Sequence, residues 1–231
     1  MTAGEGTGEA GPRFGEEPLA QTIAAAAAIR RLSALLLSLE REHPTVKAML
    51  AQFAEWEREL AVAASPDAAP RIGPDAGHTQ RLYLSHAFDI GAFNPCFPEY
   101  RFDSLGSETA SGAVNFPLVF EGPPGLVHGG FIAVFFDCVT QHQNCAAALS
   151  GKTRSLRVTF RRPTPILTEL RFDIVRSESD GQITSTARLM LDEQVLCSGE
   201  VTTLALPPDK LAGSRYAKRC ADGHGWKRSS G

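Results

Sequence analysis

A glycine-rich segment followed by a single carboxylate carries the clearest chemical signal in this chain. The segment reads Leu126-Val127-His128-Gly129-Gly130, and an apolar run follows in which Asp137 is the first charged residue. Two adjacent glycines allow a close backbone approach to a ligand and the start of a helix. The first N–H groups of a helix have no partner within it and can stabilise developing negative charge. A lone carboxylate in an apolar helix is costly unless it has a role or a partner. The pattern therefore indicates acyl-transfer chemistry.

These residues need a helix that begins at the glycines, and the sequence predicts one over about 130–149. Short strands are predicted before it over 100–105 and 113–120. After it the hydrophobic period changes to two, which predicts strands over 155–160, 169–174, 182–191 and 195–206. Asp180-Gly181 and the segment 191–194 are typical of tight turns. Two strands, one long helix and four strands favour an α+β fold in which an antiparallel sheet wraps around the helix.

The remaining segments are predicted to flank this compact domain, which we expect over residues 80–207. Residues 1–17 are small and polar, which is typical of disorder. Residues 18–79 are predicted as a helical extension with a proline-rich linker. Its two helices are expected over about 18–41 and 45–64, with Pro44 breaking the first, and could pack on the domain or on a second subunit. The polar segment 208–231 is expected to be a flexible tail.

Composition narrows the class of protein. The chain has 231 residues, of which 43% are hydrophobic and 21% charged, with a formal net charge of -3. This balance gives no reason to expect a basic face or a nucleic-acid partner. The five cysteines are scattered, which is typical of reduced thiols in a cytoplasmic protein. Arg30 and Arg31 interrupt the apolar run over 23–39, so no membrane span is expected.

The chain resembles the hotdog-fold acyl-CoA thioesterases, in particular the PaaI-like branch. The resemblance covers about residues 93–206. It rests on Asn94-Pro95, the segment 122–130, Asp137 and Arg161-Arg162-Pro163. It implies a hotdog fold, a homodimer or a dimer of dimers, and hydrolysis of an acyl-CoA substrate to free acid and CoA. No cofactor or metal is expected.

The resemblance also implies a role for each candidate residue. The Gly129 N–H would polarise the thioester carbonyl, and Asp137 would act as general base or nucleophile across a dimer interface. Thr153 would orient the attacking water. His128 would either contact the ligand or fix the loop by a hydrogen bond. The expected substrate-binding residues, with the two arginines near the nucleotide part of CoA, are Gly130, Asn94, Gln141, Arg161 and Arg162.

Several alternatives stay open at this point. Asp137, Gln141 and Asn144 share a helix face, where they could position water or form a polar seam between the central helices of a dimer. Cys138, His142 and Cys145 also share a face, but structural zinc usually takes four ligands, so small buried thiols are the favoured interpretation.

One position departs from the family pattern, since some PaaI-like enzymes carry Asn six residues before the His, where this chain has Gly122. A second hypothesis is therefore a non-catalytic acyl-CoA or lipid-binding hotdog module. A third is an interaction protein that docks a partner through its N-terminal helices. For an enzyme, the acyl pocket is expected between subunits, beside Phe131, Phe135 and the segment 93–97.

Overall fold

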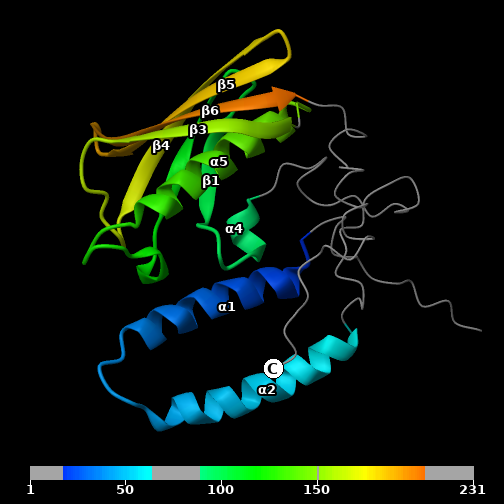
Figure 1. The fold of residues 1–231 in the computed structure, drawn as a ribbon, viewed down its shortest axis with the longest axis vertical. Coiled ribbons are helices and arrows are strands. Elements are labelled where there is room, and N and C mark those ends of the chain that lie inside the picture. The colour runs from blue at the N-terminus through cyan, green and yellow to red at the C-terminus, as the bar shows by residue number, and fades with distance from the viewer. Residues whose placement is uncertain (1–17, 64–88, 150, 206–231) are drawn as a thin grey trace, which may run out of the picture.

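The computed structural model describes residues 18–63, 89–149 and 151–205. A six-stranded antiparallel sheet packs one face against the long helix α5 (Gly129–Ala146), as Figure 1 shows. The strands are β1 (Tyr100–Leu105), β2 (Thr109–Asn115), β3 (Gly151–Phe160), β4 (Glu169–Ser179), β5 (Gln182–Leu191) and β6 (Gln194–Ala205). Their order in the sheet is β1-β2-β4-β5-β6-β3, so β1 and β3 form the edges. The predicted α+β hotdog arrangement of an antiparallel sheet around a central helix is confirmed.

Alternation along the strands and periodicity along α5 build one core between them. In β4 the side chains of Leu170, Phe172 and Ile174 face α5 and are buried, while the residues between them are more exposed. From the helix, Phe135 and Val139 are fully buried against the sheet. This packing fixes the rotation of α5, and with it the direction in which each polar residue of the helix points.

Several element bounds match the sequence prediction. The bounds of β1 and β5 are as expected, and both tight turns are present, with Asp180 at φ 52° and Asp192 at φ 53°. The bounds of the second predicted strand were wrong. It was expected over 113–120, but β2 spans Thr109–Asn115, and the end of the expected segment forms a 3-10 turn, η2 (Leu118–Phe120). Pro117 cannot donate to a strand ladder, which explains why the strand ends before it.

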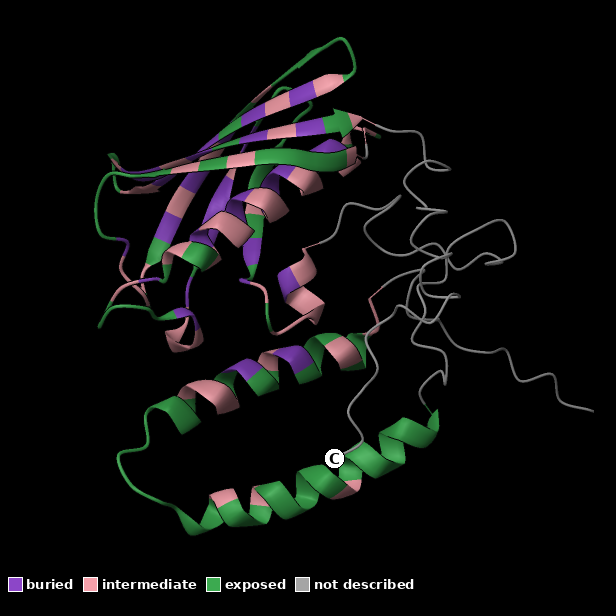
Figure 2. Ribbon diagram, in the orientation of Figure 1, coloured by how far each residue is buried: buried purple, intermediate pink, exposed green. Residues whose placement is uncertain are grey.

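The N-terminal helices are α1 (Ala20–Leu37) and α2 (Pro44–Ala63). α1 lies against η2 and the short helix α4 (Ile90–Phe93), and buries Ala26 and Arg30 there. α2 buries no residue, and Figure 2 shows it exposed along almost its whole length. Pro44 begins α2, which suits proline because the first N–H of a helix needs no partner.

α1 is the one helix in the described ranges that is long and apolar enough to cross a membrane. That finding concerns length and composition only. The predicted disordered N-terminus, the linker over 65–79 and the tail over 208–231 lie outside the described residues.

Candidate functional site

The acid on the central helix is held by a side chain from the sheet edge. Asp137 Oδ1 accepts a hydrogen bond of 2.6 Å from Thr153 Oγ1, which lies on β3. One turn further along α5, Gln141 Nε2 donates to Thr153 Oγ1 at 2.9 Å and to Thr203 Oγ1 at 2.8 Å. The structure thus brings together three predicted site residues, Asp137, Gln141 and Thr153. Thr203, on β6, was not predicted, because strand alternation alone does not distinguish it from other inward-facing residues.

The surroundings leave the carboxylate able to act on a water molecule. Asp137 is half-buried beside the fully buried Phe136, while Thr153 is exposed at the sheet edge. Oδ1 is taken by Thr153, and Oδ2 makes no hydrogen bond to any residue that the structure describes. A carboxylate with one oxygen fixed and the other open can orient and deprotonate water.

The start of α5 is organised by His128. This residue is the N-cap, and its Nδ1 accepts a hydrogen bond of 3.0 Å from the Gly130 N–H. Its carbonyl accepts from the N–H of Phe131 at 2.9 Å, and its own N–H donates to the Phe120 carbonyl at 2.9 Å. The sequence left two roles open for His128, contact with a ligand or a hydrogen bond that fixes the loop. The structure contains the hydrogen bond that fixes the loop.

His128 leaves one donor of the first turn available. The N–H groups of Gly130 and Phe131 are both engaged by His128. The Gly129 N–H has no hydrogen-bond partner among the described residues. It lies at the positive end of the α5 dipole, where partial negative charge is stabilised.

A cavity of about 440 Å³ lies beside Gly129. Phe160, the last residue of β3, forms part of its lining, together with Arg161 and Arg162. The backbone N–H groups of both arginines donate to the Leu196 carbonyl at 2.9 Å, and both side chains are exposed. The structure thus places the two predicted arginines in the same cavity as Gly129.

Within one chain, however, the two halves of the candidate site are separated. Gly129 and Asp137 are eight residues apart on α5, which corresponds to about 12 Å along the helix. A single carbonyl group cannot lie within hydrogen-bond reach of both. Within one chain, therefore, the two residues do not act on the same carbonyl group.

The Gly122 departure from the family pattern has a steric cause. A Cβ at this position would lie 2.8 Å from His128 Cα and 2.9 Å from His128 Cβ. The backbone of His128 thus occupies the space that a side chain at position 122 would need. The chain has no room for Asn there in this loop conformation.

Two other predicted polar residues lie apart from the carboxylate. Asn94 Oδ1 accepts a hydrogen bond from the Cys96 N–H at 3.1 Å and its carbonyl accepts one from Arg30, so it belongs to the junction of α1 and α4. Asn144 is fully buried, and no hydrogen bond joins its side chain to Asp137 or Gln141.

Burial favours the neutral forms of the thiol and the imidazole on the Cys138 and His142 face of α5. Burial raises the pKa of the Cys138 thiol to about 12 and lowers the pKa of His142 to about 4. His142 Nδ1 lies 3.0 Å from the Tyr100 hydroxyl. The described residues contain no group of three or more His, Cys, Asp and Glu that could hold a metal ion.

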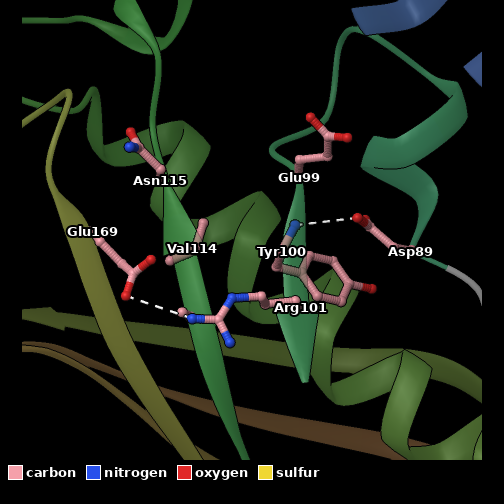
Figure 3. A pocket seen from close by; sticks show the side chains of 8 residues that line it. Asp89, Glu99, Tyr100, Arg101, Val114, Asn115 and Glu169 are labelled. Carbon is pink, nitrogen blue, oxygen red and sulfur yellow. Dashed lines mark hydrogen bonds and ion pairs between the residues drawn. The ribbon is translucent and has the colours of Figure 1, made fainter. Parts of the chain in front are cut away.

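Sequence reasoning missed one unusual acid, Asp89. It caps α4 by accepting from the Gly91 N–H at 2.8 Å, and it accepts from the Tyr100 N–H at 3.1 Å. Burial raises its pKa to about 7, against the effect of these hydrogen bonds. Figure 3 shows it beside Glu99 in a cavity of about 300 Å³, with Arg101 paired to Glu169. An Asp two residues before a Gly is a helix-cap signal that could have indicated it.

No protein-family model and no curated protein matches the sequence. Among solved structures, a thioesterase superfamily protein matches with a TM-score of 0.66 and 24% identity, covering 79% of this chain and 90% of that one. Residues 80–231 make up about two-thirds of this chain, so the match includes part of the N-terminal extension. The resemblance to hotdog-fold thioesterases is confirmed at the level of the fold.

Two further matches cover less than half of the chain. Thioesterase superfamily member 2 from Mus musculus has a TM-score of 0.41 and 15% identity, over 45% of this chain and 80% of its own. A hypothetical thioesterase from Streptococcus pneumoniae TIGR4, solved with coenzyme A, has a TM-score of 0.44 and 11% identity, over 46% and 87%.

Proposed function

We propose that this hotdog-fold chain hydrolyses acyl-CoA thioesters to free acid and CoA as a homo-oligomer built from dimers. The observation that carries the proposal is the Asp137 carboxylate, which Thr153 holds through one oxygen and whose other oxygen has no hydrogen-bond partner among the described residues. The Gly129 N–H at the start of the same helix, also without a partner among those residues, supplies the second requirement of acyl transfer, a donor for the oxyanion.

The reaction follows from these two groups. The thioester carbonyl oxygen binds the Gly129 N–H of one subunit, and Asp137 of the other subunit takes a proton from water. The water oxygen bonds to the carbonyl carbon, and the resulting oxyanion is stabilised by the N–H and the helix dipole. The C–S bond then breaks, and the CoA sulfur leaves with the proton that Asp137 returns. In a variant of this route, Asp137 attacks directly and water hydrolyses the mixed anhydride.

The dimer brings the two halves of the site together. β3 is an edge strand with Thr153 and Phe160 exposed, so its unpaired backbone groups are available to a second copy. Pairing of two β3 strands would place Asp137 of each chain near the α5 start of the other. Sedimentation equilibrium tests this, since a monomer at micromolar concentration that still hydrolyses acyl-CoA would contradict it.

The cavity beside Gly129 suits the CoA part of the substrate. Arg161 and Arg162 are exposed at its rim, and arginine forks pair well with phosphate. We also propose a cytoplasmic location, because it is compatible both with a CoA-ester substrate and with reduced cysteines. We expect no cofactor and no nucleic-acid partner.

The experiment is release of free CoA thiol from a panel of acyl-CoAs by wild type, Asp137→Ala and the control Asp173→Ala. Asp173 is a surface carboxylate paired with Arg188, so its loss tests for nonspecific effects of removing an acid. We expect Asp137→Ala to lose about 10²–10⁴ in kcat with an unchanged circular dichroism spectrum, and Asp173→Ala to keep turnover. Near-normal turnover by Asp137→Ala would sink the assignment.

A non-catalytic acyl-CoA or lipid-binding module is the second candidate. A separate, largely apolar cavity of about 470 Å³ beside α1 favours it, because such a cavity could retain an acyl chain. Stoichiometric binding of acyl-CoA without thiol release would select this alternative.

A further inference from the structure

The N-terminal helix α1 borders an open, largely apolar cavity of about 470 Å³ between itself and the sheet-and-helix body. This volume lies within the roughly 300–1,000 Å³ of small-molecule sites. On one side the lining comes from α1, including Ser33 and Leu36. On the other it comes from Pro95, Phe120 and Phe131. In Figure 1, α1 runs below the body on the side where α5 begins.

We propose that α1 forms one wall of the site for the hydrocarbon part of the acyl group, so that the N-terminal extension determines which chain lengths are accepted. This inference rests on the proposed thioesterase activity. It assigns the acyl end of the substrate to a segment outside the hotdog body.

The cavity adjoins the helix turn that presents the Gly129 N–H. Phe131 lies two residues after Gly129, and its ring centroid is 4.8 Å from that of Phe120 and 6.1 Å from that of His128. The Phe120 carbonyl accepts the His128 N–H at 2.9 Å, which ties the cavity wall directly to the cap of α5. A thioester carbonyl at Gly129 would therefore have this cavity within reach of the first few carbons of its chain.

The chemistry of the lining favours hydrocarbon over a polar ligand. Among the described residues that line the cavity, Arg30 is the single charged one, and it is 5% exposed. Its Nη1 donates to the Gly91 carbonyl at 2.7 Å, and its Nη2 lies 2.8 Å from the Glu99 carboxylate. The guanidinium is thus turned to partners at α4 and β1. Each methylene buried in such a site strengthens binding by up to about fourfold.

Arg30 also explains how α1 stays in place. α1 exposes most of its length, and Ala26 and Arg30 are its buried residues. A buried charge that bonds two carbonyls and a carboxylate fixes the helix at one rotation, because leaving those groups unpaired is costly. That rotation directs Ser33 and Leu36 into the cavity.

The test fills the cavity from α1. Ser33→Phe adds a ring inside it, Ser33→Leu adds a smaller group, and Ala28→Phe adds the same ring on the exposed side of α1. The probes are acetyl-, octanoyl- and dodecanoyl-CoA. We expect Ser33→Phe to raise the ratio of KM for dodecanoyl-CoA to KM for acetyl-CoA at least tenfold, Ser33→Leu to raise it less, and Ala28→Phe to leave it unchanged. Calorimetric affinity for dodecanoyl-CoA relative to CoA should change in parallel.

The outcomes separate this inference from the proposed function. If wild type hydrolyses none of the three probes, the activity fails, and the calorimetric affinities alone decide whether α1 lines an acyl site. If wild type is active and all variants keep the same chain-length profile and affinities, α1 is not part of the acyl site. A change of sedimentation coefficient in Ser33→Phe, with an unchanged profile, would instead indicate that a second copy occupies the cavity and would overturn the inference.

Discussion

The hydroxyl of Thr153 on the edge strand β3 donates to the carboxylate of Asp137 on the central helix α5 across 2.6 Å. The same hydroxyl accepts from Gln141, so its proton is directed at the carboxylate. The orientation of the acid therefore depends on a strand whose outer edge is free to pair with another chain. In the proposed dimer, the geometry of the acid and the assembly would be coupled through this one contact.

Replacing Thr153 by Val should lower kcat about 10- to 100-fold with little change in KM, because a hydrogen bond to a charged group contributes about 1.5–3 kcal/mol. Thr153→Ser keeps the hydroxyl and should remain within a few-fold of wild type. Thr159→Val, on the exposed part of the same strand, is the matched control. Steady-state kinetics on one acyl-CoA decide the matter, and equal kcat values for Thr153→Val and Thr159→Val would remove Thr153 from the site.

His128→Asn should keep both stability and turnover, whereas His128→Ala should lose about 1 kcal/mol of stability. Asn can cap α5 in place of the imidazole, since an Asn side-chain oxygen also accepts from an early helical N–H, as Nδ1 does from Gly130. Urea unfolding and acyl-CoA kinetics measure the two effects. A large loss of turnover in a stable His128→Asn protein would show that the ring contacts substrate.

Gly122→Asn should destabilise the protein by about 1–3 kcal/mol and lower activity, although some PaaI-like enzymes carry Asn at the corresponding position. The new Cβ would meet the His128 backbone at 2.8 Å and so displace the cap of α5. Gly181→Asn is the control, because Gly181 has open space and a φ of 73° that Asn tolerates. Thermal melts compare the two variants, and a Gly122→Asn protein as stable as wild type with higher turnover would contradict this account.

The fold, and the shared helix face of Asp137 and Gln141 in the candidate site, could be predicted from the sequence because both depend on local signals. The change of hydrophobic period around α5 and the turn residues were enough for the sheet and its central helix. Asp137 and Gln141 are one helical turn apart, so their shared face followed from spacing alone. The family resemblance supplied Thr153.

The rest depended on contacts between distant segments. Thr203 joins Gln141 across 62 residues, and Arg30 joins Gly91 across 61. No local pattern encodes either contact. The end of β2 was misplaced because an apolar run continues past Pro117, and hydrophobicity outweighed the missing donor in the prediction.

Asp89 and His142, which are both partly buried, should change the pH dependence of the free energy of unfolding in opposite directions. Burial raises the pKa of Asp89 from 3.8 to about 7, so between these values the folded chain keeps a proton that the unfolded chain has lost. The contribution of Asp89 to the free energy of unfolding therefore falls as the pH rises from 3.8 to about 7. Burial lowers the pKa of His142 from 6.5 to about 4. Between these two pH values the unfolded chain keeps a proton on His142 that the folded chain has lost, so the free energy of unfolding rises with pH. The two effects offset each other between about pH 4 and 6.5.

In Asp89→Asn, the contribution of His142 to the pH dependence of stability should no longer be opposed by that of Asp89. Relative to wild type, its free energy of unfolding should increase with pH between about 4 and 7 by up to about 1.4 kcal/mol per pH unit, and the difference should level off above pH 7. His142→Gln should show the reverse, a stability that falls over the same range because Asp89 is then unopposed. Urea unfolding at pH 4.5, 5.5, 6.5 and 7.5 measures both slopes, with the surface variant Asp173→Asn as control. Parallel profiles for wild type and Asp89→Asn would mean that Asp89 is ionised in the folded chain throughout this range.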